Sequence, residues 1–358
     1  MPQVIRQTAT VPSERAGERL DHVAVVLFPD FSRSQLQTWI RAGELRVDGK
    51  TRRPRDTMFG GEALVQGATR ISQSLNISPL VVGFTVVAIG TSLPELAVAI
   101  EAIESDVPNI AVGGVLGSNV ANVMLVLGAA AVLGAKSDSE IGITRDSIAV
   151  VVATMFMTIF VYFGEVTLLG GVVMLACLFG YYYYTYSVAI SEEDEYEFED
   201  SWLPNKLSLA IPICAIGGTM IWFGAELLVS GSTGIAETFG VSEAIIGLTV
   251  VALGTSLPEL AVTIVAGIRG QGGVAVGNVL GSNVMNIMGI IGIASIVGSG
   301  IPVDVEFQRD IIVVIATSGF VVWMLISGKE FTKNIGTVMI LTYLFYMTYL
   351  GGFLDGLF

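Results

Sequence analysis

The sequence reads VGFTVVAIGTSLPE at residues 82–95 and IGLTVVALGTSLPE at residues 246–259, a constant offset of 164 positions. The same offset aligns GGVLGSNVANVMLVLG (113–128) with GNVLGSNVMNIMGIIG (277–292) without a gap. Self-similarity at one fixed period indicates a duplicated structural unit. We therefore expect two related halves that are fused in one polypeptide.

The composition of the chain indicates a membrane protein. Of the 358 residues, 53% are hydrophobic and only 14% are charged, and the mean hydropathy is +0.72. An ordinary soluble domain has about 25% charged residues. A bundle of transmembrane helices accommodates this composition because lipid is itself an apolar solvent. The net charge of -14 argues against a nucleic-acid partner for the bulk of the chain.

Apolar runs that are long enough to cross a bilayer begin only after residue 58. These runs lack the alternation of apolar and polar residues that marks the strands of a β-barrel. The fold class predicted here is an all-α polytopic membrane protein. About nine transmembrane helices are expected, at residues 79–103, 109–134, 146–164, 167–190, 206–230, 244–268, 273–298, 310–328 and 335–354.

The two halves are predicted to be inverted repeats. From one copy of Gly-Thr-Ser-Leu-Pro-Glu to the other there are five spans, counting one span of the pair, and an odd number turns the second copy upside down. Basic loop residues support this arrangement by the positive-inside rule, and all but Arg309 fall on one side: Arg70, Lys136, Arg145, Lys206, Arg269, Lys329 and Lys333. Inverted repeats are typical of secondary transporters, which bind their substrate near the bilayer midplane.

Two acidic residues, Glu95 and Glu259, lie in the middle of well-formed apolar spans. A carboxylate at that depth costs at least a few kcal/mol, which makes it a functional-site hypothesis by default. Each follows a proline, Pro94 or Pro258, which breaks the helix and frees backbone oxygens inside the bilayer. The alternative, a purely structural pairing of the carboxylates with other helices, is disfavoured because no Lys or Arg lies nearby at that depth.

Helical spacing gathers further oxygen-bearing residues on the same faces. The second repeated segment, which we also expect to be broken, contributes a serine and an asparagine four residues apart. The candidate set is Ala88, Thr91, Ser92, Glu95, Ser118, Asn122, Ala252, Thr255, Ser256, Glu259, Ser282 and Asn286, where the alanines offer backbone carbonyls. Ligands that are all oxygen suit hard cations such as Ca2+ or Na+ and argue against Zn2+ or copper.

These two segments resemble the paired repeats of the cation/calcium antiporters, and of the sodium/calcium exchangers in particular. The resemblance covers residues 59–358. It implies two inverted five-helix halves and alternating binding of Ca2+ and Na+ by the residues named above. Many members have Asp where this chain has Asn286, so a third carboxylate is missing and the ion stoichiometry and K+ dependence stay open. The resemblance implies a transporter with no cofactor and no enzymatic activity.

The duplication also predicts that one helix has been replaced. Residues 203–222 supply most of the first helix of the second half, and the offset aligns them with residues 39–58. That aligned stretch, WIRAGELRVDGKTRRPRDTM, is too highly charged to cross a membrane. The first helix of the first half is therefore expected to be missing, except for a short piece near residues 59–71.

The residues that replace it have a signature of their own. LDHVAVVLFPDFSRSQLQTWIRAGELRVDGK (20–50) resembles the small α+β RNA-binding domain at the N-terminus of ribosomal large-subunit pseudouridine synthases. The resemblance implies RNA contacts through Arg33, Arg41, Lys50, Arg52 and Arg53, and no pseudouridine chemistry, because the catalytic domain is absent. A folded remnant without a ligand is the alternative. The chain thus has the character of a chimera.

The expected organisation follows from these observations. Residues 1–58 form a small cytoplasmic domain, 59–190 the truncated first repeat, 191–205 an acidic cytoplasmic loop, and 206–358 the second repeat. The leading hypothesis is a Ca2+/Na+ antiporter in the plasma (inner) membrane of a prokaryote, impaired by loss of the first helix. A Ca2+/H+ antiporter and a membrane-tethered RNA-binding protein without transport are the alternatives.

Overall fold

The computed structural model describes most of the chain. The described residues are 24, 26, 28, 31–42, 46–47, 50–51, 60–75, 77–133, 143–191, 206–238, 252–269 and 271–350. The chain divides into two compact units, Met1–Gly60 and Gly61–Phe358, and each is described by itself.

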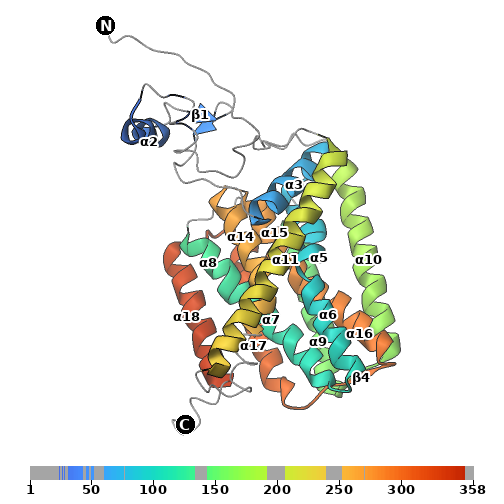
Figure 1. The fold of residues 1–358 in the computed structure, drawn as a ribbon. Helices are drawn as coiled ribbons and strands as arrows, with labels where there is room; N and C mark the ends of the chain where they lie inside the picture. Colours follow the sequence, from blue (N-terminus) through green and yellow to red (C-terminus); the bar gives the residue numbers. More distant parts are fainter. Residues whose placement is uncertain are drawn as a thin grey trace. The chain divides into compact units, whose positions relative to one another are not determined.

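The first unit contains a helix and a small hairpin (Figure 1). Helix α2 spans Arg33–Ala42 and begins after Ser32, whose hydroxyl accepts a hydrogen bond from the backbone N–H of Gln35 at 3.3 Å, a typical N-cap contact. Strands β1 (Arg46–Val47) and β2 (Lys50–Thr51) pair antiparallel. Residues 39–58 are predicted to contain no membrane helix. The described residues 46–47 and 50–51 form a hairpin, so the prediction is confirmed for them.

The second unit contains the apolar helices, and two short strands, β3 (Glu165–Val166) and β4 (Ile301–Pro302), pair antiparallel at one end of it. The helices of its first half are α3 (Gly60–Leu75), α4 (Pro79–Val82), η2 (Gly83–Val87), α5 (Ala88–Thr91), α6 (Leu93–Glu104), α7 (Pro108–Ala121), η3 (Asn122–Val126), α8 (Leu127–Val132), α9 (Ile143–Phe163) and α10 (Leu168–Ser191). Those of its second half are α11 (Leu207–Thr238), α13 (Ala252–Thr255), α14 (Leu257–Ile268), α15 (Gly272–Val284), η5 (Met285–Ile291), α16 (Gly292–Val297), α17 (Phe307–Ile326) and α18 (Lys333–Leu350).

Within the described part of the chain, six helices are long and apolar enough to cross a membrane, or up to seven if the bent pair Pro79–Thr91 and Leu93–Glu104 counts as one span. The predicted span at 335–354 corresponds to α18, which is not among these six. The predicted span at 244–268 falls partly outside the described residues, so the expected number of nine stays a prediction.

The break at the repeated Ser-Leu-Pro-Glu is confirmed in both halves. Helix α5 ends at Thr91 and α6 begins at Leu93. The segments Pro79–Thr91 and Leu93–Glu104 are bent by 43° relative to each other at the intervening Ser92. Ser256 separates α13 from α14 with nearly the same backbone angles, φ -87° and ψ 1°. Each proline stands in the first turn of the following helix, where its missing N–H costs nothing.

The prediction that the second repeated segment is also broken is wrong. Residues 108–132 and 272–297 each form one continuous span that widens into a π-helical turn, η3 or η5. A π-turn inserts an extra residue into the helix and is often found at functional sites. Neither η3 nor η5 contains a proline, and in both the helix widens by a π-turn and continues.

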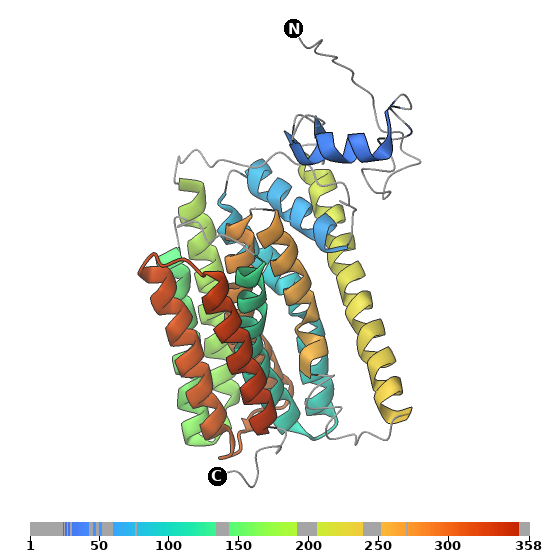
Figure 2. The ribbon, with the colours of Figure 1, turned by 90° about the vertical axis from the view of Figure 1, so that its left-hand side faces the viewer.

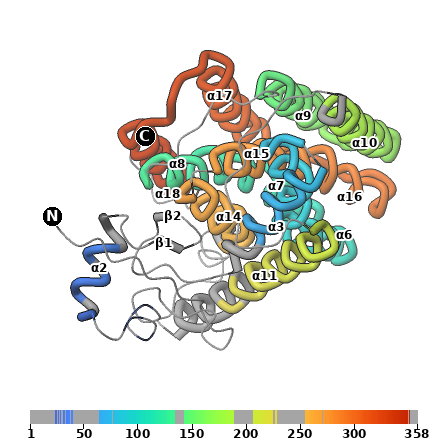
Figure 3. Tube along the Cα trace, turned by 90° about the horizontal axis from the view of Figure 1, so that it is seen from above, coloured from blue at the N-terminus to red at the C-terminus, as the bar shows by residue number. Residues whose placement is uncertain are grey.

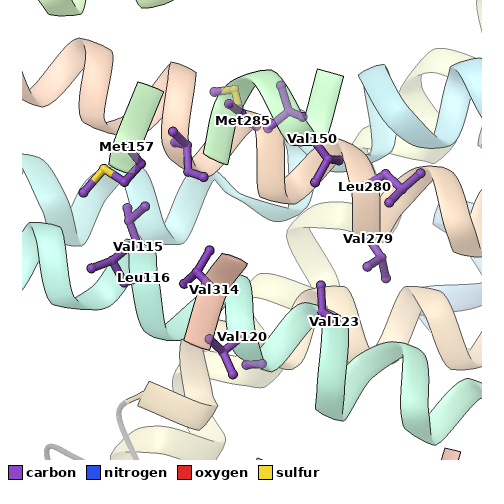
Figure 4. Packing of buried hydrophobic residues seen from close by; sticks show 14 of the residues in the cluster. Val115, Leu116, Val120, Val123, Val150, Met157, Val279, Leu280, Met285 and Val314 are labelled. Atoms are coloured by element: carbon purple, nitrogen blue, oxygen red, sulfur yellow. The ribbon is translucent and has the colours of Figure 1, made fainter. Parts of the chain in front are cut away.

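Helices α7 and α15 occupy the middle of the bundle when it is viewed from one end (Figure 3). Valine, leucine and methionine side chains from these helices, α9 and α17 interlock around them (Figure 4). Glycines bring α15 close to the first half: a Cβ atom on Gly277 would lie 2.4 Å from the carbonyl oxygen of Leu80, and one on Gly281 2.2 Å from that of Phe84. Any larger residue at Gly277 or Gly281 would push these helices apart.

The halves meet on a pseudo-two-fold axis. Asn119 donates from its Nδ2 to the backbone oxygen of Asn283 at 3.3 Å, and Asn283 donates to the backbone oxygen of Asn119 at the same distance. These two residues are 164 positions apart, so each contacts its own copy. Only residues on the axis of a two-fold arrangement do this, and the inverted-repeat prediction is confirmed.

A second duplicated contact explains why Arg309 departs from the loop-charge pattern. Arg145 pairs with the buried Asp146 at 2.8 Å, and the hydroxyl of Tyr181 also donates to that carboxylate. In the second half, the offset aligns Arg309 and Asp310 with this pair, and Asp310 accepts a hydrogen bond from Tyr346 at 2.9 Å. Arg309 and Asp310 are thus the copies of Arg145 and Asp146 in the second repeat. Because the second repeat is inverted, the copied arginine is expected at the opposite side of the membrane from Arg145, which accounts for its departure from the loop-charge pattern.

The first helices of the two halves differ in length. Helix α11 has 32 residues, whereas α3, its counterpart, has 16. At 1.5 Å per residue, α3 is only about 24 Å long, less than a bilayer's hydrocarbon core of about 30 Å. Helix α3 is nevertheless packed firmly: a Cβ atom on its Gly67 would lie 2.7 Å from the backbone nitrogen of Cys214 on α11 (Figure 2).

Candidate functional site: a buried oxygen cluster between the halves

A network of hydrogen bonds from both halves surrounds the Glu259 carboxylate. Its Oε1 accepts from the hydroxyl of Ser92 at 3.3 Å and from that of Ser282 at 3.4 Å. Ser92 comes from the break between α5 and α6, and Ser282 comes from the middle of α15. Glu259 and both serines are fully buried. The two halves therefore build this part of the site together.

Glu95 has the opposite environment. Its side chain is 6% exposed, yet among the described residues neither of its carboxylate oxygens has a hydrogen-bond partner. Ser92, whose hydroxyl donates to Glu259, begins the turn that leads into the helix carrying Glu95, so the first half reaches both carboxylates. A buried ionised carboxylate without a partner costs several kcal/mol. A bound cation would remove that cost for both groups at once.

Several other buried oxygens of the predicted set also have no partner among the described residues. They are Glu259 Oε2, Asn122 Oδ1, Asn286 Oδ1 and Ser256 Oγ. Native proteins leave few buried polar atoms unpaired, so such a concentration calls for an explanation. The donor chemistry, carboxylate, amide and hydroxyl oxygen, fits a hard cation. Within the described part of the chain, no group of three or more His, Cys, Asp or Glu side chains is found.

The remaining predicted residues occupy the same helices. Asn286 donates to the hydroxyl of Ser118 at 2.9 Å, which joins η5 to α7. Thr91 contacts the hydroxyl of Ser282 at 3.4 Å and the carbonyl oxygen of Ala88 at 3.3 Å. Thr255 is half-buried at the end of α13, and Ala252 begins that helix.

The predicted RNA-binding residues belong to the other unit. Arg33 and Arg41 lie at the two ends of α2, and Lys50 begins β2. Arg52 and Arg53 lie outside the described residues.

Sequence reasoning missed Asn278, which is fully buried on α15. Its Nδ2 donates to Thr263 Oγ1 at 3.0 Å and to the backbone oxygen of Glu259 at 3.4 Å, and its Oδ1 accepts from Thr91 at 3.2 Å. A signal was available in the alignment of the two repeats, because the offset pairs Asn278 with Gly114. A polar residue in only one copy of a buried segment marks a place where the halves differ.

Comparison with known proteins agrees with both parts of the sequence. The family model "Sodium/calcium exchanger protein" matches residues 57–187 and 209–352, and the model "S4 domain" matches residues 18–57. The sodium/calcium exchanger MaX1 of Methanosarcina acetivorans is 28% identical over 334 residues, covering 81% of this chain and 94% of its own length. A solved structure of the sodium-calcium exchanger NCX_Mj superposes with a TM-score of 0.71 at 28% identity, covering 81% of this chain and 93% of the other.

The N-terminal residues match a different protein. Ribosomal large subunit pseudouridine synthase D of Xanthomonas campestris is 54% identical over 56 residues, which cover 16% of this chain and 17% of the synthase. The similarity is confined to the S4 domain, so it carries no enzymatic activity to this chain. With its duplicated apolar halves and buried oxygen cluster, the chain is a multi-pass membrane protein that belongs to the sodium/calcium exchanger family and carries an S4 domain ahead of the exchanger repeats.

Proposed function

We propose that this chain is a secondary active antiporter for Ca2+ and Na+, built around the buried oxygen cluster near the bilayer midplane and impaired in exchange by the loss of its first helix. The observation that carries the proposal is the pair Glu95 and Glu259, two buried carboxylates, one from each half, that have unpartnered oxygens among the described residues. Two carboxylates neutralise one divalent cation, and the surrounding hydroxyl and amide oxygens replace its hydration shell. The same oxygens suit Na+, which allows the two ions to bind in turn.

The repeats give this site access to both sides of the membrane in turn. Each half contributes one glutamate, so a movement of one half against the other opens the site without dismantling either half. We propose that residues 59–190 and 206–358 are the two moving repeats. Residues 1–58 and the acidic segment 191–205 are assigned to the cytoplasmic side of a prokaryotic plasma membrane, in agreement with the loop charges.

The coupling ion is tested by Ca2+ uptake into proteoliposomes. The assay uses the chain with a restored first helix, whose design is given in the Discussion. With Na+ loaded inside and none outside, we expect Ca2+ to accumulate, and a pH gradient alone should give no uptake above that of empty vesicles. The Glu95→Gln protein is the matched control for leakage. Uptake driven by the pH gradient and indifferent to Na+ would identify a Ca2+/H+ antiporter instead.

Replacing Asn286 by Asp should tighten Ca2+ binding about tenfold. The Oδ1 of Asn286 has no partner among the described residues, and its Nδ2 donates to Ser118. An aspartate would add a third negative charge next to a divalent ion in a low-dielectric site, and Ser118 can turn its hydroxyl to donate to it. Calorimetric titration of the purified protein with Ca2+ measures the change. A weaker affinity would remove Asn286 from the set of ligands.

The S4 domain supports a second, separate activity. We infer that residues 18–57 contact structured RNA through Arg33, Arg41, Lys50, Arg52 and Arg53, independently of the cation site. A gel shift of the purified full chain with ribosomal RNA fragments should weaken steeply as salt rises. A chain that shifts no RNA even at low salt would leave this domain a folded remnant without a ligand.

A further inference from the structure

Asn278 takes part in a polar contact that exists in only one half. The offset of 164 pairs Asn278 with Gly114, and it pairs the hydrogen-bond partner Thr263 with Ala99. Both members of the contact are thus polar in the second half and small in the first. The side-chain ligands proposed above, by contrast, have the same residue type in both copies. The two halves therefore supply the same ligand residues, but only the second half has the Asn278–Thr263 hydrogen bond beside them.

The contacts of Asn278 fix which way its amide points. The backbone oxygen of Glu259 can only accept a hydrogen bond, so the Nδ2 group must face it, 3.4 Å away. The same Nδ2 lies 3.0 Å from Thr263 Oγ1. The Oδ1 atom must then face Thr91, and because Oδ1 can only accept, the Thr91 hydroxyl is the donor across the 3.2 Å that separates them.

This orientation decides what Thr91 can offer to a cation. A hydroxyl has one proton and two lone pairs. When the proton is directed toward Asn278 or toward the carbonyl oxygen of Ala88, 3.3 Å away, the lone pairs are left for the ion. Asn278 also holds the backbone of Glu259, the carboxylate of the other half. One buried side chain thereby ties a ligand of the first half to a ligand of the second.

The geometry points to Asn278 as a positioning residue of the cation site, which holds the Thr91 oxygen and the Glu259 turn ready for Ca2+. This inference rests on the proposed function, because it concerns the same site. The positioning role exists in one repeat only. Gly114, the residue aligned with Asn278, has no side chain that could support Thr255 and Glu95, the counterparts of Thr91 and Glu259. We assign Asn278 to positioning because both its Nδ2 and its Oδ1 are engaged with protein groups.

The test is a double-mutant cycle on the purified full chain, with Ca2+ binding measured by calorimetry. We expect Asn278→Ala to weaken Ca2+ binding about tenfold, the size expected from losing buried hydrogen bonds that orient a ligand. In a Thr91→Val background, the hydroxyl that Asn278 orients is gone, so the same substitution should cost about twofold or less. Asn278→Ser serves in the same cycle if the alanine variant does not fold.

Asn283→Ala is the matched control, because it truncates another buried asparagine of the same helix, whose Nδ2 donates to the backbone oxygen of Asn119. Its effect on Ca2+ binding should be the same with and without Thr91→Val. Wild-type protein that binds no Ca2+ would overturn the proposed function itself. Wild-type protein that binds Ca2+, together with Asn278 variants that bind equally well or whose loss is independent of Thr91, would overturn the positioning role alone.

Discussion

Glu95→Gln and Glu259→Gln should each weaken Ca2+ binding by at least about a hundredfold, or about 2.7 kcal/mol, while the protein stays folded. Glutamine keeps the size and one oxygen of the side chain but removes the charge. A single remaining carboxylate then faces a divalent ion in a low-dielectric site, so half of the neutralising charge is lost. Because neither carboxylate oxygen of Glu95 has a hydrogen-bond partner among the described residues, its neutral replacement costs the fold little. Calorimetric titration with Ca2+ measures both variants.

Glu101→Gln provides the control for these two variants. Glu101 stands on the same helix as Glu95, α6, but it is exposed. Removing its charge should leave Ca2+ affinity within about twofold of wild type, since exposed charges act weakly through solvent and salt. Unchanged Ca2+ affinity in either Glu95→Gln or Glu259→Gln would show that the buried carboxylates are not the binding site.

Restoring a full first helix should raise Na+-dependent Ca2+ exchange at least about tenfold. In the second half, the 32 residues of α11 supply the first helix, whereas α3 supplies 16. No proposed ligand comes from the absent stretch, so Ca2+ binding can persist. Transport, unlike binding, is expected to fail. Without that helix, lipid or water can reach polar groups on one access path that must be sealed from them. We expect the chain as it stands to exchange Ca2+ poorly or not at all.

The repair replaces residues 1–58 with an apolar span copied from LPNKLSLAIPICAIGGTMIW (203–222), which the offset aligns with 39–58, so that it joins residue 59 in register. Uptake into proteoliposomes is compared for the original and the repaired chain at equal protein content. Adding Glu95→Gln to the repaired chain should abolish the gain, which excludes a nonspecific leak. Full exchange activity in the unrepaired chain would mean that the first helix is dispensable.

The duplication made much of the fold predictable. A candidate ligand residue in one half identified its counterpart in the other through the offset. Pro94 and Pro258 marked where the helices break, because proline cannot complete a helical hydrogen bond. The π-turns at η3 and η5 were not predictable in this way. They result from how a whole span packs between its neighbours, and no residue of a kind that requires them stands there.

The candidate site was predictable in its composition but not in its asymmetry. The two repeats have the same residue type at Glu95 and Glu259, whereas in the described structure only Glu259 accepts hydrogen bonds from serines. Asn278 escaped notice because a single asparagine in a glycine-rich helix reads as a packing residue. Its role depends on Thr91, 187 positions away, and no local pattern reports such a contact.

The reciprocal bonds between Asn119 and Asn283 bear on how the molecule changes the side to which it opens. An inverted-repeat transporter reverses its orientation when each half takes the conformation that the other had. A contact on the axis maps onto itself in this exchange, so the asparagine pair acts as a pivot that both orientations keep. The hydrogen bond from Thr91 to Asn278 has no counterpart at Gly114. A contact that only one half can make breaks the equivalence of the halves, so we expect the two orientations to differ in free energy.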